Sequence, residues 1–526
     1  MFRSMKTCMT ASRRARSDYE QNKDPRVHQI TVRVDGRMAT LNIGQMRQDF
    51  ARLESEIADG PIVPIVTAEE IRAHLQSRYD FERRMSLEDV IADVEAMLRK
   101  WQVQVTHPRY FGLFNPSVTL ASVIADTLTA MYNPQLANWR TSPAANEVER
   151  HTLGWLSAKF GLPQDSIATF TSGGMEANLS AVVVALTRKF PSYGEHGLRH
   201  LAGQPTIYLT EEAHHGFNKI AHITGLGRHC LRPIVTDRHL RMDIEQLSST
   251  VAEDRRNGLL PFMVVGNAGT TAAGAIDSLP EIARVCSGAD LWFHVDAAWG
   301  GAAILSPDLR HHLAGIEAAD SITCDAHKWF SVPMGCGMFF CRHPESVAQA
   351  FRSEVSYMPG KLPGIGEEAS NTFNPFTNSI QWSRRFIGLK LFMALAEQGE
   401  RGYAEMIDHQ ARVGHLLRES LRATGWRIVN STPLPLVCFT REGLVPSTLL
   451  AALRENQVAW MSEAMLDGVS VMRACITSFR TTEQDIHSVV DEMNRLFSNS
   501  IHAENTATSL TTIDECHTEV RTGTIR

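Results

Sequence analysis

The 526-residue sequence contains no long apolar run, no paired-cysteine spacing and no internal repeat. Its apolar stretches are short and interrupted by charge, so none reaches the ~20 apolar residues that a transmembrane helix needs. The nine cysteines are scattered without the spacing of a metal site, and we therefore expect no metal centre. Several cysteines fall in apolar runs, which favours free buried thiols in a reducing compartment such as the cytoplasm.

The charge balance also lacks a strong bias. A formal net charge of −6 gives no reason to expect a nucleic-acid or membrane partner. Hydrophobic residues make up 43% of the chain and charged residues 21%, which is typical of a soluble globular protein. The first 16 residues carry five basic residues and no acidic residue. A disordered tail and a transit peptide are the two interpretations of this composition.

The order of sequence signals divides the chain into five parts. Asp35–Gly36, between two alternating segments, predicts a β-hairpin. A capping-box pattern from Thr481 to Gln484 predicts the start of the last helix. The expected parts are a disordered basic tail (1–27), a hairpin followed by helices (28–100), a large α/β domain (101–395), a small C-terminal α/β domain (396–500) and a disordered polar tail (501–526).

Two apolar segments end abruptly in polar residues that can carry chemistry. Leu291 to Gly301 contains Asp296, and Ser321 to Phe330 contains His327 and Lys328. Both segments are typical of buried strands, and ligands bind outside the carboxyl ends of parallel strands. A buried carboxylate and a lysine next to a histidine are the minimum set for pyridoxal 5′-phosphate (PLP). The lysine would carry the aldehyde as a Schiff base, and the carboxylate would keep the pyridine nitrogen protonated.

A third segment predicts a phosphate-binding turn. The apolar run Ile167 to Phe170 is followed by Thr171-Ser172-Gly173-Gly174, and then by a helical pattern from Met175 to Phe190. Glycines between a strand and a helix let backbone N–H groups approach an anion, and a helix N-terminus favours negative charge. A Gly-Gly turn is weak evidence by itself, because glycine is an ordinary turn residue. Together with the two other strand ends it becomes strong.

With these motifs in order, the chain resembles the group II PLP-dependent amino-acid decarboxylases, which include aromatic amino-acid, glutamate, cysteine-sulfinate and diaminobutyrate decarboxylases. The resemblance covers roughly residues 100 to 480. It implies an α/β chain of the aspartate-aminotransferase-like fold (fold type I), and a homodimer with its active site at the subunit interface. The matching segments are 107–112, 142–149, 171–178, 213–214, 269–271, 294–299, 325–329 and 383–385.

The resemblance also implies residue roles. Lys328 would bind PLP covalently, Asp296 would pair with the pyridinium nitrogen, and His214 would stack on the ring and reach the substrate carboxylate. His214 matches the motif better than His215 because it follows the alanine. The remaining cofactor contacts implied are those of Ser172, Gly173, Gly174, Met175, Thr270, Ala298 and His327, the last of them with the phosphate.

Two departures from the family pattern concern the chemistry. Met175 stands where family members commonly carry Ser or Thr, so only its backbone N–H is available to phosphate. The family's mobile loop, expected between Ser356 and Ser379, often carries a late tyrosine that protonates Cα. This chain has Phe373 and Phe376 there instead. Decarboxylation to the amine is the main prediction. The alternative is oxidative deamination to an aldehyde or another Cα bond cleavage, and a catalytically silent binding homologue is a third interpretation.

The substrate side is predicted least closely. The resemblance places Phe111, Phe114, Trp139 and Arg140 where the family builds its pocket. Arg140 is unusual there and would bind a side-chain carboxylate bidentately, although a structural ion pair explains it equally well. The sequence therefore leaves open whether the amino-acid substrate is acidic, aromatic or of another kind.

Overall fold

The computed structural model describes residues 29–34, 37–351 and 373–499. The chain forms two compact units, which divide between Gly60 and Pro61. The segment expected as one N-terminal part, 28–100, is thus split between them. The basic tail, the loop residues 352–372 and the polar tail lie outside the described residues, as do the predictions made for them.

The first unit contains the predicted hairpin. β1 (Gln29–Val34) pairs antiparallel with β2 (Arg37–Asn42), and Val34 lies opposite Arg37. The two central residues of the turn lie outside the described part. Helix α2 (Ile43–Asp59) follows at once, because the side chain of Asn42 accepts a hydrogen bond from the Gln45 N–H and caps the helix. It ends at Gly60.

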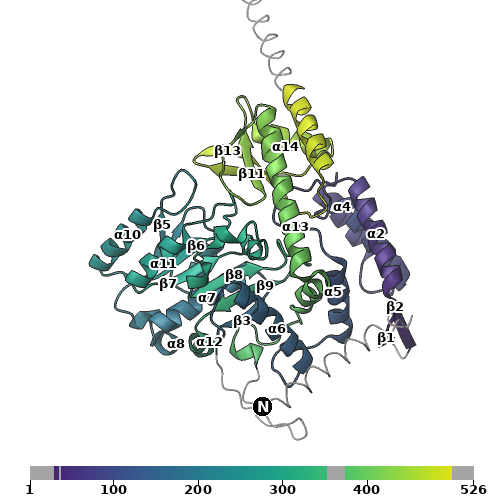
Figure 1. Ribbon diagram of the computed structural model, residues 1–526. Helices are drawn as coiled ribbons and strands as arrows, with labels where there is room; N and C mark the ends of the chain where they lie inside the picture. Colours follow the sequence, from purple (N-terminus) through teal and green to yellow (C-terminus); the bar gives the residue numbers. More distant parts are fainter. Residues whose placement is uncertain (1–28, 35–36, 352–372, 500–526) are drawn as a thin grey trace, which may run out of the picture. The chain divides into compact units, whose positions relative to one another are not determined.

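The second unit is built on a seven-stranded sheet (Figure 1). All strands are parallel except β9, which runs antiparallel to both of its neighbours. The predicted α/β architecture is therefore confirmed. In spatial order the strands are β3 (Ile167–Thr171), β9 (Gly337–Cys341), β8 (Ser321–Asp325), β7 (Trp292–Asp296), β6 (Leu260–Asn267), β4 (Pro205–Thr210) and β5 (Leu231–Ile234).

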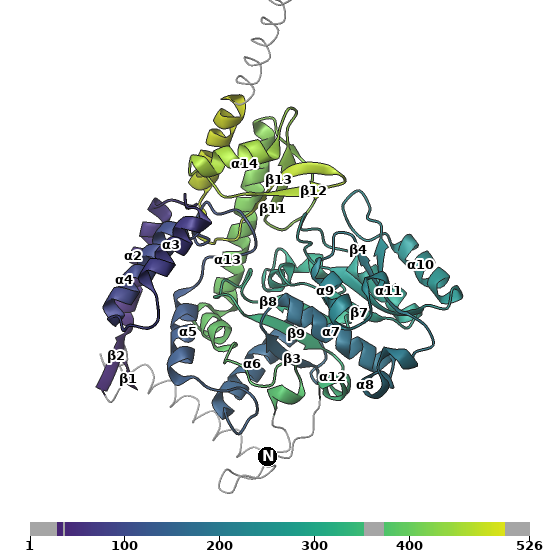
Figure 2. The same cartoon turned by 180° about the vertical axis from the view of Figure 1, so that it is seen from behind.

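Alternate residues of these strands enter two separate apolar clusters, one on each face of the sheet. In β6, Met263 and Val265 belong to one cluster and Val264 to the other. This follows from the two-residue period of a strand and from burial of both faces. The face that carries Met263 and Val265 packs against α7 (Gly174–Lys189), α9 (Gly216–Ile223) and α12 (Pro344–Phe351). The face that carries Val264 packs against α6 (Pro143–Lys159), α10 (Ile244–Arg256) and α11 (Leu279–Gly288). Figure 2 shows the same elements from the side opposite to that of Figure 1.

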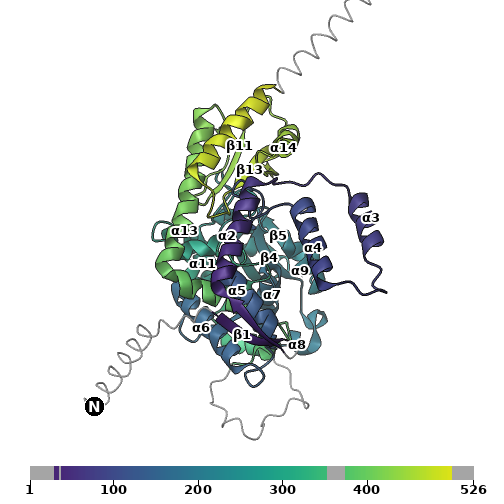
Figure 3. The ribbon, with the colours of Figure 1, turned by 90° about the vertical axis from the view of Figure 1, so that its right-hand side faces the viewer.

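A long helix, α13 (Leu389–Ala423), joins this sheet to the small C-terminal sheet (Figure 3). It kinks at Gly399, whose φ of 66° leaves the helical region, and the expected domain boundary at 395/396 falls inside it. Residues 426–440 form two strands, with Pro433 and Pro435 between them. The antiparallel order is β10 (Arg427–Ile428), β11 (Leu436–Thr440), β13 (Val469–Cys475) and β12 (Ser462–Leu466), with α14 (Pro446–Glu455) packed against β12 and β13.

The last helix, 483–499, begins one residue later than the sequence pattern predicts. The reciprocal capping bonds join Thr482 and Asp485: the Asp485 N–H donates to the Thr482 hydroxyl at 3.2 Å, and the Thr482 N–H donates to the Asp485 carboxylate at 2.9 Å. The predicted cap at Thr481 was wrong because its hydroxyl donates instead to the Pro108 carbonyl at 2.6 Å.

The second unit also contains three helices that precede the sheet in the sequence: α3 (Ala68–Arg78), α4 (Leu87–Trp101) and α5 (Leu120–Tyr132). A short α8 (Tyr193–His196) and several 3-10 turns connect other elements. Like α2, helices α3 and α4 contain no buried residue. Within the described residues, no helix combines the length and apolar character required to span a bilayer.

Candidate active site

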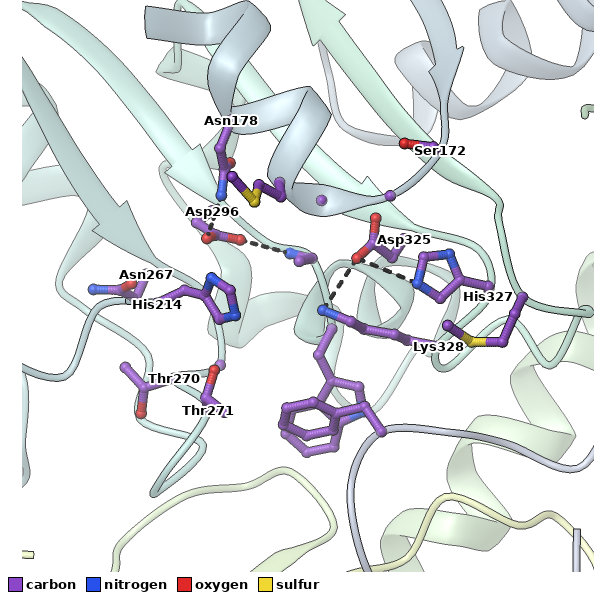
Figure 4. Close-up of a pocket in the computed structure, with 18 residues that line it drawn as sticks. Ser172, Asn178, His214, Asn267, Thr270, Thr271, Asp296, Asp325, His327 and Lys328 are labelled. Carbon is purple, nitrogen blue, oxygen red and sulfur yellow. Dashed lines mark hydrogen bonds and ion pairs between the residues drawn. The ribbon is translucent and has the colours of Figure 1, made fainter. Parts of the chain in front are cut away.

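The predicted cofactor-binding residues and Phe114 meet in one cavity of about 280 Å³ at the carboxyl ends of the parallel strands (Figure 4). Each segment leaving β3, β4, β6, β7 and β8 supplies part of its wall, because parallel strands direct these ends to the same edge of the sheet. The lining residues are Phe114, Ser172, Gly173, Gly174, Met175, Asn178, His214, Asn267, Gly269, Thr270, Thr271, Asp296, Ala298, Trp299, Asp325, His327, Lys328 and Met334.

Lys328 faces a carboxylate that the sequence reasoning did not select. Its Nζ lies 3.1 Å from Oδ2 of Asp325, the last residue of β8. The Asp325 side chain is only 2% exposed, and its other oxygen has no hydrogen-bond partner in the part of the chain that is described. Lys328 therefore compensates a buried charge, which would otherwise be costly. The motif Asp325-Ala-His-Lys carried the signal, but only the lysine and histidine were assigned roles.

Asp296 ends the neighbouring strand β7 and is held on both oxygens. Its Oδ2 accepts a hydrogen bond from Asn178 Nδ2 at 2.9 Å, and its Oδ1 accepts one from the Ala298 N–H at 3.1 Å. The carboxylate is 8% exposed. Asn178 lies on α7, one turn after the Gly-Gly turn that begins this helix, and within the matched segment 171–178. Its role depends on a tertiary contact, so sequence reasoning missed it.

The Gly-Gly turn allows an approach that no other residue type would permit. A Cβ placed on Gly174 would lie 2.8 Å from Asp325 Oδ2, and one placed on Gly173 would lie 3.2 Å from His327 Cε1. Helix α7 begins here, so its first N–H groups and its positive dipole end face the cavity. Ser172 also lines the cavity, but its hydroxyl donates to Glu176 Oε2 at 2.6 Å.

Both predicted histidines present a proton donor toward the cavity. The Gly216 N–H donates to Nδ1 of His214 at 3.1 Å, and the Cys336 N–H donates to Nδ1 of His327 at 3.0 Å. Desolvation by burial lowers the pKa of each histidine below its usual value, which favours the neutral ring. A neutral ring whose Nδ1 accepts carries its proton on Nε2.

The remaining predicted residues separate into two groups. Thr270 and Ala298 line the cavity, as does Phe114, whose ring stacks on Trp299 with centroids 4.6 Å apart. Phe111 does not: it is fully buried in the apolar cluster of the small sheet. Trp139 and Arg140 are also outside this wall.

Phe111 and the segment Trp139–Arg140 lie outside the cavity wall for different reasons. Phe111 is held in the core because its N–H donates to the Trp460 carbonyl and its carbonyl accepts from the Cys475 N–H. The Trp139 indole N–H donates to Glu147 Oε1 at 3.0 Å, and its backbone N–H donates to Asn374 Oδ1. These bonds hold the segment that contains Arg140 against α6 and Asn374, outside the cavity wall.

The donor set fits PLP. The turn at Gly173–Gly174 suits a phosphate, Asp296 offers a carboxylate to a protonated ring nitrogen, and Lys328 offers the amine. The Asp325 oxygen without a partner marks a polar position in the same wall. Three different strand ends thus supply the three groups that such a cofactor needs. The geometry defines a PLP site of the kind expected from the sequence.

Comparison with known proteins identifies the family. The sequence model described as the pyridoxal-dependent decarboxylase conserved domain matches residues 71–442. An aromatic-L-amino-acid decarboxylase of Bacillus atrophaeus is 29% identical over 406 residues, which cover 74% of this chain and 82% of that protein. A phenylacetaldehyde synthase of Arabidopsis thaliana is 27% identical over 422 residues, which cover 76% and 84%.

The fold has close counterparts among solved structures. The structure of Catharanthus roseus tryptophan decarboxylase in complex with L-tryptophan matches with a TM-score of 0.77 at 22% identity, over 87% of this chain and 97% of that chain. Fold and site thus define a PLP-dependent enzyme of fold type I. The chain belongs to the pyridoxal-dependent decarboxylase family. It is a PLP-dependent amino-acid decarboxylase.

Lys328 provides the first test of the site. We expect borohydride reduction of the holoenzyme to attach the cofactor to the peptide that contains Lys328, as read by mass spectrometry, because no other lysine lines the cavity that the structure describes. Lys328→Ala should abolish turnover. Lys159→Ala is the matched control, since Lys159 pairs with Glu400 away from the cavity and should leave activity unchanged. Label on a different lysine would contradict the assignment.

Proposed function

We propose that the enzyme decarboxylates an aromatic L-amino acid whose side chain lies against Phe114. The aromatic wall carries this proposal: Phe114 stacks on Trp299, and Trp299 stacks on Trp329 with centroids 5.3 Å apart. Met334 adds a polarisable apolar surface to the same cavity. Relatives with the names aromatic-L-amino-acid, tryptophan and tyrosine decarboxylase support the same substrate class.

The residues of the cavity divide the work of the reaction. PLP, when bound, supplies a ring that accepts the electron pair left at Cα as CO2 departs. Asp296 would hold the ring nitrogen in its protonated form, because both of its oxygens are already fixed by hydrogen bonds and cannot rotate away. Asp325 would hold the proton of the Lys328 ammonium at its Oδ2 whenever the lysine is not bound to the cofactor.

His214 would orient the substrate and supply a proton. Its Nε2–H faces the cavity, and this donor suits a substrate carboxylate before CO2 leaves. Because burial lowers the pKa of His214, the ring is neutral at physiological pH and retains one proton at Nε2. Two groups that line the cavity, the Nε2–H of His214 and the ammonium of Lys328, could then donate a proton to Cα after CO2 has left.

The substrate class has a direct test. Phe114→Leu keeps an apolar side chain but removes the aromatic face, so we expect kcat/KM for the preferred aromatic substrate to fall about threefold to tenfold, as the loss of an aromatic pair predicts. Phe111→Leu is the matched control, since Phe111 lies in the core of the small sheet. Preference for an acidic amino acid, together with a raised KM in Arg140→Met, would contradict the proposal and restore Arg140 as the substrate ligand.

A second candidate product is the aldehyde. The last part of the expected loop contains Phe373 and Phe376, and neither side chain can donate a proton. The Phe376 ring lies beside Trp382, with centroids 5.0 Å apart, and does not line the cavity. The oxidative reaction would consume the amino acid, O2 and water, and would release aldehyde, CO2, ammonia and hydrogen peroxide. The similarity to a relative named phenylacetaldehyde synthase supports the aldehyde as a second candidate product.

Product analysis in air and under nitrogen separates the two outcomes. We expect the amine as the main product in both atmospheres, because His214 can take over the role of a proton donor. His214→Gln should then shift the ratio toward aldehyde and peroxide, since removing a general acid slows protonation by about 10²–10⁴-fold. Stoichiometric peroxide formation by the unaltered enzyme in air would instead establish the aldehyde as its natural product.

The enzyme is further proposed to be a homodimer in a reducing compartment such as the cytoplasm. Four apolar residues form an exposed stripe on α4: Leu87 (69% exposed), Ile91 (55%), Val94 (39%) and Leu98 (56%). Their spacing of three or four residues is that of a helix face that packs against a partner. Closed two-fold dimers are the commonest oligomers. The buried thiols from Cys230 to Cys475 are free, which supports the compartment.

Sedimentation equilibrium tests the dimer. We expect the unaltered protein to sediment at twice the chain mass, and Ile91→Asp combined with Val94→Asp to dissociate it by placing charges in an apolar contact. The matched control is Ala96→Asp on the opposite side of α4, which should remain dimeric. A fully active monomer would disprove the assembly.

A further inference from the structure

A line of buried polar groups extends from Asp296 into the sheet, away from the cavity. Trp292, His294 and Asp296 alternate along β7, so their side chains emerge on the same face of the strand, beneath α7. Ser321 of β8 lies directly opposite His294 in the strand register. Asn178 reaches this line from α7. All five residues are buried, with exposed fractions from 0% to 8%.

The hydrogen bonds along this line can point in only one direction. A carboxylate only accepts, so Asn178 must present its amide nitrogen to Asp296 Oδ2, at 2.9 Å. Its amide oxygen then faces His294 Nε2 at 2.9 Å, and that nitrogen must be the donor.

The same logic fixes the far end of the line. A neutral His294 has one N–H, so its Nδ1 accepts from the Ser321 hydroxyl at 2.8 Å. The Ser321 oxygen in turn accepts from the Trp292 indole N–H at 2.8 Å. Burial lowers the pKa of His294 to about 4, which agrees with a neutral ring. Every donor in the line points toward Asp296, and the indole N–H, which cannot accept, starts it.

We propose that Asn178, His294 and Ser321 are positioning residues that act through Asp296: their one-way hydrogen bonds hold its carboxylate as a fixed, ionised acceptor for the ring nitrogen of PLP. This inference rests on the proposed role of Asp296. Of the three residues, only Asn178 lines the cavity. Hydrogen bonds donated to a carboxylate favour its charged form, and aligned bonds in a buried chain strengthen one another.

The line explains why these residue types are buried here at all. An amide, an imidazole and a hydroxyl inside a sheet are costly unless each finds a partner, and each of these groups has one. Replacing one of these residues by an apolar residue removes the hydrogen bond that it donates toward Asp296. It also leaves at least one buried polar atom without a partner. The effect on the ring nitrogen should therefore shrink as the substitution moves away from Asp296.

The test uses the holoenzyme loaded with PLP labelled with ¹⁵N in its ring, and reads the ¹⁵N chemical shift of the bound cofactor. We expect Asn178→Leu and His294→Phe to move this shift toward the value of the unprotonated ring, with Ser321→Ala moving it less and Ser321→Thr restoring it. PLP should bind about tenfold more weakly to Asn178→Leu, the size expected when a buried acceptor loses its donor.

A matched control separates positioning from general destabilisation. Tyr208→Phe removes a buried hydroxyl from the neighbouring region of the same sheet, where it donates to Asp254 at 2.7 Å. It should lower thermal stability without changing the ¹⁵N shift. If Ser321→Ala and Asn178→Leu also lower only the stability, the line is structural and the inference fails.

Asp296→Asn distinguishes that failure from failure of the proposed function. Loss of ring protonation in Asp296→Asn, with no shift in the Asn178 and His294 variants, would reject the line alone. An unchanged ring in Asp296→Asn would reject the role of Asp296 itself, and with it the inference. Where His294→Phe does not fold, the Ser321 pair decides the outcome.

Discussion

Two carboxylates buried at the ends of adjacent strands constrain the whole active site. Asp296 and Asp325 end β7 and β8, and both open into the same cavity. Burying a charge without compensation costs several kcal/mol, so each must be matched by donors or by a cation. Asp325 is matched by Lys328, and Asp296 by a side-chain amide and a backbone N–H. The different compensation would give the two acids different roles, because Asp325 faces the Lys328 amine and Asp296 is fixed by two hydrogen-bond donors.

Close packing around the first turn of α7 follows from the same arrangement. Gly174 approaches Asp325 and Ala298 so closely that a Cβ would collide with the carboxylate. The helix N-terminus thereby comes within reach of both strand ends, where its dipole favours negative charge. Met175 at this turn offers no hydroxyl, so anion binding here would rely on the backbone and on His327, whose Nε2 carries the proton.

The small sheet contributes to the site through one buried cation. Arg473 of β13 is 3% exposed, and its Nε donates to the carbonyl of Thr271, a residue of the cavity wall, at 3.0 Å. Its NH1 donates to the Gly112 carbonyl at 2.8 Å, and its guanidinium lies 5.0 Å from the centre of the Phe114 ring. Arg473, which is far from Phe114 in the sequence, therefore packs against the Phe114 ring and stabilises its position. A change in the small sheet would be transmitted to Phe114 through packing rather than through direct contact with a ligand.

The sequence by itself determined the elements whose signals are local. The paired strands Gln29–Val34 and Arg37–Asn42, the buried strands that end at Asp296 and before Lys328, and the Gly-Gly turn depend on short-range periodicity and turn chemistry, so they could be predicted directly. Tertiary structure decided what depends on contacts between distant segments. Asn178 became a partner of Asp296 only because α7 packs on β7, and Phe111 became a core residue only because the small sheet covers it. The cap of the last helix moved from Thr481 to Thr482 because a carbonyl of Pro108 occupied the Thr481 hydroxyl. Hydrogen-bond partners far apart in the chain leave no local pattern, and for this reason the fold was more predictable than the details of its site.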